Sequence, residues 1–374
     1  MALPIYKKYN GSIIPWAKPA LWGREKDYII NALESLWISG GEYIERLEND
    51  FAELFNKKCV LAVCNGTAAI QLPYLALGLK PGDEVIVPGF SFMAAANLAL
   101  QMNLRPVFAE VDPDTWCITA ENVERLISPR TRVIVPVHTY GNVCNMKEIY
   151  AVANKHRLII IEDCAEALFS KISGLYCGTF GDCGSFSFQA TKTITTGEGG
   201  LVITDDDDLY KKMLLYRSHG LLERGSYNHA LPGNNFRLTN LQAAFGCAQF
   251  EKSTVIIEKR EKMHGKYYNL LCSQAGWKLQ AFRPEVQPIL WAFALKLDPQ
   301  AFPQGRDTVI NQLKEKSIET RPGFTASSLM GIYEPHSLPV CEDLSRNILT
   351  LPSFPSIREE EIEYVCNQLK GLMK

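Results

Sequence analysis

The sequence lacks long hydrophobic runs and an excess of charge of either sign. No stretch approaches the roughly 20 apolar residues that a membrane-spanning helix requires, and residues 1–22 contain no apolar core of the kind found in signal peptides. Lys and Arg together number 39, against 41 Asp and Glu. A balanced charge provides no electrostatic basis for binding nucleic acid or an anionic membrane surface. We therefore expect a cytoplasmic protein that acts on a small molecule.

The sequence also lacks paired motifs for metal or disulfide formation. Its eleven cysteines are odd in number, include no Cys-X-X-Cys pair and lie partly inside apolar segments. This usage is typical of buried thiols in a reducing compartment. His138, His219 and His229 do not stand at metal-ligand spacing, so we expect each to be a hydrogen-bonded residue of a loop or strand end. The sequence predicts no metal site.

Short apolar runs alternate with helical periodicity between about residues 57 and 205. The predicted strands are residues 59–63, 84–87, 106–111, 133–137, 158–161, 186–188 and 201–204. The predicted helices are residues 67–79, a segment beginning at residue 91, 119–127 and 145–157. Pro73 should kink the first of these helices. Such alternation predicts an α/β fold with a mainly parallel central sheet covered by helices on both faces.

The second half of the chain has a different pattern. A long helical stretch runs from Thr239 towards Ala275, and isolated elements follow Gly276. These elements are a strand near residues 289–296 and helices near residues 307–316 and 359–370. A chain of 374 residues is long enough for two domains. We predict a large domain at residues 1–250 and a smaller C-terminal α+β domain at residues 251–374, with the N-terminal segment packing on the small domain.

Lys192 lies between an apolar strand and a glycine-rich turn, where ordinary surface lysines are seldom found. Asp163 stands at the carboxyl end of a predicted buried strand, where the ligands of parallel sheets collect. Catalysis with pyridoxal 5′-phosphate (PLP) requires at least two residues: a lysine that can form a Schiff base, and an aspartate that can keep a pyridinium nitrogen protonated. A helix cap or a structural ion pair is the alternative for Asp163.

Three further segments are candidates for contact with such a cofactor. Gly66 and Thr67 follow a strand and begin a helix, where free amides and the helix dipole favour a phosphate, although a simple capped turn fits them as well. Phe92 follows the next strand and either faces a flat ring or belongs to the core. Ser187 alternates with two phenylalanines, so its hydroxyl faces the opposite side of the strand, towards a pocket or solvent.

Several ordered segments resemble the DegT/DnrJ/EryC1/StrS family of sugar aminotransferases, which are fold type I PLP enzymes. The resemblance covers nearly the whole chain. The segments that carry it are CNGTAAIQL (64–72), VIVPGFSFMAAAN (85–97), VHTYGNVCNM (137–146), IIIEDCAEAL (159–168), GTFGDCGSFSFQATKTITTGEGGLVITDD (178–206), NNFRLTNLQAAFG (234–246) and IETRP (318–322). The resemblance implies a PLP-dependent aminotransferase that moves an amino group from L-glutamate to a nucleotide-linked keto sugar.

The resemblance also implies roles for individual residues. Lys192 forms the Schiff base and later moves protons, Asp163 contacts the pyridine nitrogen, and Phe92 stacks on the ring. The residues expected to hold the phosphate are Gly66, Thr67 and Ser187. Because the family forms homodimers whose active sites are completed across the interface, Asn235 is expected to reach the phosphate bound by the partner chain.

Three segments are most similar to those of GDP-perosamine synthases, which aminate C4 of a nucleotide-linked 4-keto-6-deoxysugar. They are EDCAEAL (162–168), KTITTGEGG (192–200) and DLSRNILTLPSFPSI (343–357). This likeness implies deoxysugar biosynthesis, as for the O-antigen of lipopolysaccharide. Other positions depart from the group: Gln189-Ala190 replaces Phe-Gly, and Asn234, Thr325 and Ser328 stand where Tyr, Tyr and His are usual. The nucleotide, the sugar and the aminated carbon therefore stay open.

Three more residues complete the predicted site. Glu166 stands where the resemblance places a group near the phenolic oxygen of the cofactor, and a carboxylate beside a phenolate must be protonated or share a proton. We therefore predict that its pKa is raised. Arg321 and Trp37 are expected to contact the nucleotide sugar through charge and stacking. A structural salt bridge for Arg321 and a core indole for Trp37 are the alternatives.

Other functions within this fold remain open. A 3-keto sugar aminotransferase would use the same lysine, aspartate and cofactor. A PLP-dependent sugar 3-dehydratase carries His at the position of Lys192, which argues against dehydration here. A non-catalytic regulator would retain the cofactor without turnover, but the sequence shows no DNA-binding extension.

Overall fold

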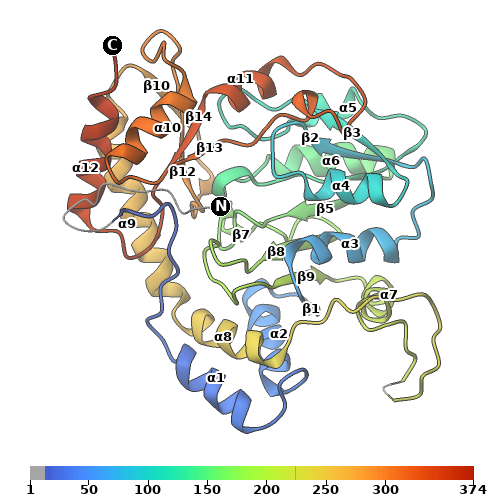
Figure 1. Cartoon of the computed structure of the whole chain (residues 1–374). Helices are drawn as coiled ribbons and strands as arrows, with labels where there is room; N and C mark the ends of the chain where they lie inside the picture. The colour runs from blue at the N-terminus through green and yellow to red at the C-terminus, as the bar shows by residue number, and fades with distance from the viewer. Residues whose placement is uncertain (1–12, 224) are drawn as a thin grey trace.

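A seven-stranded sheet forms the centre of the computed structural model, which describes residues 13–223 and 225–374 (Figure 1). Its strand order is β1-β9-β8-β5-β4-β2-β3. β9 runs antiparallel to β1 and β8, and every other neighbouring pair is parallel. The strands are β1 (Cys59–Val63), β2 (Glu84–Pro88), β3 (Arg105–Ala109), β4 (Thr131–Ile134), β5 (Ile159–Asp163), β8 (Cys183–Ser187) and β9 (Gly200–Thr204). The predicted mainly parallel sheet is confirmed.

Helices cover both faces of this sheet because the strands are apolar on both faces. In β1, Val60 and Ala62 belong to the core on one face, whereas Leu61 and Val63 belong to the core on the other. The helices on the first face are α2 (Glu42–Phe55), α5 (Ala120–Glu124), α6 (Met146–His156) and α8 (Asn240–Glu251). Those on the second face are α3 (Gly66–Ala76), α4 (Ala94–Gln101) and α7 (Asp207–Arg217).

The carboxyl ends of six strands meet at one edge of the sheet. β1 and β8 are each antiparallel to β9, so β1 runs in the same direction as β8, β5, β4, β2 and β3. Loops that follow parallel strands at a shared edge are where α/β folds bind ligands. The residues carried by these loops include Gly66, Phe92, Tyr140, Glu166 and Lys192.

The C-terminal part of the chain adds a second, antiparallel sheet beside the first (Figure 1). Its strand order is β10-β12-β14-β13, and its own core includes Tyr267, Leu295 and Ile362. The elements of this part are α9 (Ser253–Leu271), β10 (Trp277–Leu279), β12 (Phe293–Leu297), α10 (Arg306–Glu315), β13 (Arg321–Pro322), η2 (Ser327–Leu329), α11 (Pro339–Asn347), β14 (Ile348–Leu351) and α12 (Glu359–Lys370).

The N-terminal segment runs along this second sheet. The amide of Ile14 donates to the carbonyl of Ser317, at 2.9 Å, and the indole Nε1 of Trp16 donates to Thr350 Oγ1, also at 2.9 Å. α1 (Glu25–Glu34) then packs against α8. The remaining short elements are η1 (Thr139–Gly141) and a three-stranded sheet of β6 (Lys171–Ile172), β7 (Leu175–Tyr176) and β11 (Val286–Gln287).

Several element boundaries differ from the sequence prediction. The single helix expected from Thr239 towards Ala275 is two helices, α8 and α9, separated at Lys252. A capping box between Thr239 and Gln242 begins α8, which explains why its start was visible in the sequence. α3 continues through Pro73 to Ala76, so the proline does not end the helix.

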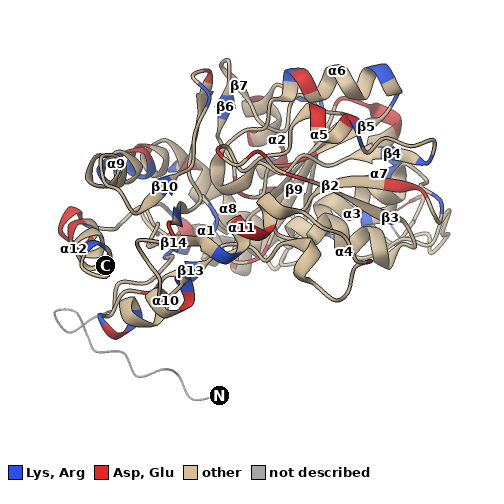
Figure 2. Ribbon diagram, turned by 90° about the horizontal axis from the view of Figure 1, so that it is seen from above, with Lys and Arg blue, Asp and Glu red and all other residues tan. Residues whose placement is uncertain are grey.

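Charged residues of both signs are interspersed along the ribbon (Figure 2). Among the described helices, none combines the length and the apolar character needed to cross a bilayer. All eleven cysteines are free thiols, and nine of them are buried.

Candidate active site

A cavity of about 640 Å³ opens where the strand ends meet the second sheet. Its lining combines loops after β1, β2, β4, β5 and β8 with residues from both ends of the chain. Eight of the residues predicted for the site line this one cavity: Gly66, Thr67, Phe92, Asp163, Glu166, Ser187, Lys192 and Arg321. Residues that stand far apart in the sequence therefore share one binding space.

Lys192 reaches into this cavity from the loop after β8. Its Nζ lies 3.8 Å from the centroid of the Trp291 ring. Burial of the amino group lowers the pKa of Lys192, and the nearby carboxylates of Glu166 and Asp163 oppose that shift. A lysine with a lowered pKa has more of its free amine form at neutral pH, which is the form that attacks a carbonyl.

Asp163 is the last residue of β5, and its side chain is almost completely buried. Its Oδ1 accepts a hydrogen bond of 3.0 Å from the amide of Ala165. Burial raises the pKa of Asp163, while the Ala165 amide, Lys192 and His138 act in the opposite direction. A carboxylate in this position is stabilised by a cation that enters the cavity.

Glu166 is also buried and lies in the next turn of the same loop. Burial raises the pKa of Glu166 to about 7, although Lys192 and the amide of Tyr140 favour the ionised form. The Tyr140 amide donates to Glu166 Oε2 at 2.8 Å. Tyr140 has φ of 58°, a left-handed conformation that costs energy for a bulky residue and is often found at functional sites. The raised pKa agrees with the protonated or proton-sharing carboxyl that we predicted.

The first turn of α3 forms one corner of the cavity. Asn65 caps the helix by accepting a hydrogen bond from the amide of Ala68, at 2.8 Å. Gly66 and Thr67 are the first two residues of the helix, so their amides have no acceptors within it. Both residues line the cavity. A Cβ built on Gly66 would lie 2.8 Å from the Cβ of Ser187. This corner is a close-packed cradle of amides and hydroxyls that fits an anion.

Aromatic rings line the other walls. Phe92 is 64% exposed, so the alternative of a core phenylalanine is wrong for this chain. Tyr140 and Phe324 stack with ring centroids 5.2 Å apart, and Trp291 stacks on Tyr140 at 6.2 Å. Arg321 reaches the cavity from β13 and is paired with Glu319, so it both lines the site and forms a salt bridge.

Trp37 and Asn235 lie outside this cavity. Trp37 is 57% exposed, which excludes the core indole, and it lines a separate hollow with Arg217 and Arg237. Asn235 is exposed, and its Oδ1 accepts a hydrogen bond from Arg237 Nε at 2.9 Å. Within a single chain neither residue contacts the cavity that holds Lys192.

Sequence reasoning missed several lining residues, including Trp16, Tyr140, Trp291, Phe324 and Thr350, whereas Gln189 had been noted only as a departure from the related enzymes. Tyr140 follows a predicted strand at the ligand-binding edge, so the strand-end rule had the signal to find it. Trp16 and Trp291 carry no comparable local signal, because only long-range packing brings them to the cavity.

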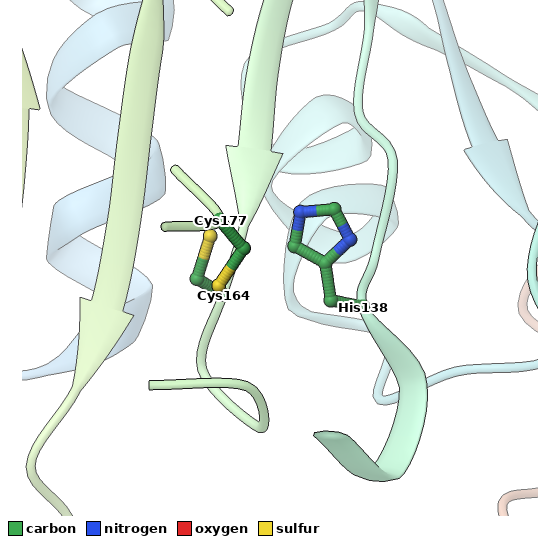
Figure 3. A group of neighbouring side chains, drawn as sticks. All are labelled: His138, Cys164 and Cys177. Atoms are coloured by element: carbon green, nitrogen blue, oxygen red, sulfur yellow. The ribbon is translucent and has the colours of Figure 1, made fainter. Parts of the chain in front are cut away.

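A second cluster of chemically active side chains lies behind Asp163. His138, Cys164 and Cys177 place their nitrogen and sulfur atoms within 4.8 Å of one another, and the imidazole faces the two sulfurs (Figure 3). His138 Nδ1 accepts from the amide of Cys144 at 3.1 Å, and Nε2 contacts Glu162 Oε2 at 3.0 Å. Both ring nitrogens are thus occupied by protein groups. The cluster is explained as a buried hydrogen-bond network that supports the end of β5.

A lysine and an aspartate at the carboxyl edge of a mainly parallel sheet define the chain as a fold type I PLP enzyme, and the comparisons agree. The model of the DegT/DnrJ/EryC1/StrS aminotransferase family matches residues 20–370. The chain belongs to this family and is an aminotransferase. The resemblance noted in the sequence is confirmed.

Individual relatives match nearly the full length of the chain. GDP-perosamine synthase of Escherichia coli O157:H7 is 38% identical over 359 residues, which cover 95% of this chain and 97% of that protein. GDP-perosamine synthase of Vibrio cholerae is 36% identical over 366 residues, which cover 96% of this chain and 99% of that protein. The crystal structure of the aminotransferase TlmJ from Streptoalloteichus hindustanus superimposes on this chain with a TM-score of 0.91. The two sequences are 26% identical, and the match covers 96% of this chain and 98% of TlmJ.

The residues present fit PLP. The buried Asp163 carboxylate suits a protonated ring nitrogen, the amine of Lys192 suits the aldehyde, and the first turn of α3 suits the phosphate. Each of the three polar ends of the cofactor, the ring nitrogen, the aldehyde and the phosphate, therefore has a matching group in the cavity.

Replacing Gly66 with alanine is expected to weaken PLP binding by about ten- to hundredfold. The added methyl would crowd Ser187, and overpacking of this kind costs roughly 1–3 kcal/mol. Titration of PLP into the cofactor-free protein, followed by absorbance, measures the dissociation constant. Gly265→Ala is the matched control because no atom lies within 4 Å of its added Cβ. Equal affinities in the two variants would contradict a phosphate at this corner.

Replacing Glu166 with glutamine is expected to stabilise the PLP-free protein above pH 7. The pKa of Glu166 is raised by folding from 4.5 to about 7, so between these values the unfolded state loses a proton that the folded state retains. Stability therefore falls as the pH rises through this window, by on the order of 3 kcal/mol, and glutamine removes the loss. Urea unfolding at pH 5 and pH 8 tests this, and a difference that does not grow with pH contradicts it.

Proposed function

We propose that this aminotransferase moves an amino group from L-glutamate to C4 of a GDP-linked 4-keto-6-deoxysugar. The observation that carries the proposal is the full-length similarity to two GDP-perosamine synthases, at 38% and 36% identity, in a chain whose Lys192 and Asp163 share one cavity. Amination at C3 would use the same residues, and the experiment below separates the two. The match of residues 20–370 to a family of aminotransferases argues against a non-catalytic role.

Lys192, Asp163 and Glu166 have different roles in the proposed reaction. PLP, when bound, supplies a ring that withdraws electrons from the substrate carbon. Lys192 Nζ would carry a proton between the substrate carbon and the C4′ carbon of the cofactor, acting first as a base and then as an acid. Asp163 would keep the ring nitrogen protonated through its negative charge. Glu166, with its pKa near 7, would share a proton with the phenolic oxygen.

The sugar side of the cavity supports a substrate that differs in detail from those of the relatives. Arg321 offers a cation that suits a diphosphate or a carboxylate, beside the ring of Phe324. Thr325 is exposed, and Ser328 Oγ donates to Glu342 at 2.9 Å and does not line the cavity. Neither residue replaces the aromatic ring or the imidazole that the sequence lacks at these positions.

A homodimer is part of the proposal. Leu36 and Trp37 are 85% and 57% exposed, which is unusual for large apolar side chains and favours contact with another chain. Asn235 is exposed near the same hollow and would reach the partner's phosphate. Nine buried free thiols support a reducing, cytoplasmic compartment. We propose deoxysugar biosynthesis as the pathway, with the O-antigen of lipopolysaccharide as the destination of the product.

The two half-reactions test the function separately. The purified protein is loaded with PLP, L-glutamate is added, and the loss of the absorbance band of lysine-bound PLP is followed. We expect conversion with L-glutamate and regeneration of the band by a GDP-linked 4-keto-6-deoxysugar. Regeneration only by UDP- or dTDP-linked sugars, or an amino group found at C3 in the product by NMR, would contradict the assigned substrate. A band unchanged by every amino donor would contradict transamination.

A further inference from the structure

Trp291 lies directly against the reactive amine. The Nζ of Lys192 sits 3.8 Å from the centroid of the indole ring, well within the distance at which a cation is attracted to an aromatic face. Trp is the side chain that attracts cations most strongly in this way. The indole is buried, so water competes little for the ammonium group at this point.

The indole is held in place by a hydrogen bond and by contacts with other aromatic rings. Its Nε1 donates to the carbonyl of Thr191 at 3.0 Å, which ties the ring to the loop that carries Lys192. The edge of Trp16 packs against it, with centroids 5.4 Å apart, and Tyr140 stacks on it. Phe324 also stacks on the indole, with ring centroids 6.4 Å apart, and the amino group of Lys192 lies over the same ring.

Arg260 fixes the backbone on both sides of this contact. Its Nη1 donates to the carbonyls of Leu290 and Trp291, at 2.9 and 3.2 Å, and its Nη2 donates to the carbonyl of Lys192 at 3.5 Å. One guanidinium from α9 thus joins the chain at Trp291 to the chain at Lys192. A rigid frame of this kind is needed to hold a side chain at a defined distance from a reacting group.

The charged and titratable groups around Lys192 come from several elements. Asp163 and Glu166 face it from the loop after β5 and favour its protonated form. Arg260 approaches its carbonyl from α9, and the buried phenol of Tyr140 lies beside Trp291. The indole ring attracts the ammonium but has no net charge. It therefore does not disturb the protonation of the carboxyl groups.

We propose that Trp291 is a positioning residue whose indole face holds the protonated amino group of Lys192 while that group is not bonded to the cofactor. The inference rests on the proposed function, in which Lys192 takes a proton from the substrate carbon. In that step the C–H bond would break, an N–H bond would form at Nζ, and the bound cofactor would accept the electron pair left by the C–H bond. The indole stabilises the resulting ammonium and keeps it within reach for the return of the proton.

The test measures the protonation of Lys192 in the PLP-free protein, so it does not depend on substrate or turnover. Acetic anhydride labels lysines in their free amine form, and mass spectrometry gives the labelling rate of Lys192 against pH, relative to exposed lysines of the same chain. In Trp291→Phe, which keeps a buried ring with a weaker attraction, we expect the midpoint to move to lower pH. Below the midpoint, labelling should be about two- to fivefold faster.

Trp291→Leu should shift the midpoint further in the same direction. Easier access of the reagent would raise the limiting rate at high pH without moving the midpoint, so the pH profile separates the two effects. Trp277→Leu is the matched control, because Trp277 in β10 is also buried and donates its Nε1 to a carbonyl, that of Leu271 at the end of α9. A midpoint that is unchanged in Trp291→Phe, or that moves to higher pH as better hydration would cause, overturns the proposal even if the aminotransferase assay succeeds.

Discussion

Replacing Lys192 with alanine is expected to lower the rate of amino transfer by at least about ten-thousandfold. Alanine removes the amine that bonds to the cofactor and the base that moves the proton between the two carbons, and a positioned base alone contributes roughly 10²–10⁴. No other lysine lines the cavity among the described residues. Product formation from L-glutamate and a GDP-linked keto sugar measures the effect.

Two further variants make this result specific. Lys192→Arg keeps the positive charge but cannot act as a free amine, so it should be as inactive as the alanine variant. Lys211→Ala removes an exposed lysine of α7 and should retain full activity. Both Lys192 variants should bind PLP without the absorbance band of a Schiff base. Substantial amino transfer by either Lys192 variant would refute the assignment of this residue.

Replacing Asp163 with asparagine is expected to lower the rate by about a hundred- to thousandfold. Asparagine has the same shape and can still accept the hydrogen bond from Ala165, so the change removes mainly the negative charge. Without that charge the ring nitrogen loses its proton more readily, and the ring withdraws electrons less strongly. The magnitude follows from losses seen when one preorganised electrostatic group is removed from an active site.

The stability of the PLP-free protein provides the control for this variant. Burial raises the pKa of Asp163, so the ionised carboxylate opposes folding at neutral pH when no cation is present. Asp163→Asn should therefore unfold at an equal or higher temperature than the unmodified chain without PLP, even though its activity falls. A lower melting temperature together with lost activity would instead indicate a structural role for Asp163.

The sequence predicted the parts of the site that depend on local pattern. Alternating apolar runs and helical periodicity indicated a mainly parallel sheet, and the shared edge of such a sheet brings strand-end residues together. Asp163, Gly66 and Lys192 could be found in this way because each lies at the end of a strand with a clear apolar signal or within five residues after it. The structure places all three around one cavity.

The rest of the site depends on contacts between distant parts of the chain. Trp16 and Trp291 reach the cavity only because the N-terminal segment and the second sheet fold back over the strand ends. The pattern around Trp37 favoured neither burial nor exposure, and the structure places the ring largely in solvent. The sequence prediction did not include α1, α2, α7 and α11, all of which lie outside the βα repeat.

The hydrogen bond between Trp16 and Thr350 has a consequence for how the enzyme is made. The two residues are 334 positions apart, and both line the cavity. A growing chain on the ribosome carries the lysine loop long before residue 350 has been synthesised. The complete cofactor cavity can therefore close only after the chain has been synthesised as far as residue 350, and the lysine loop cannot hold PLP in its final setting before that point.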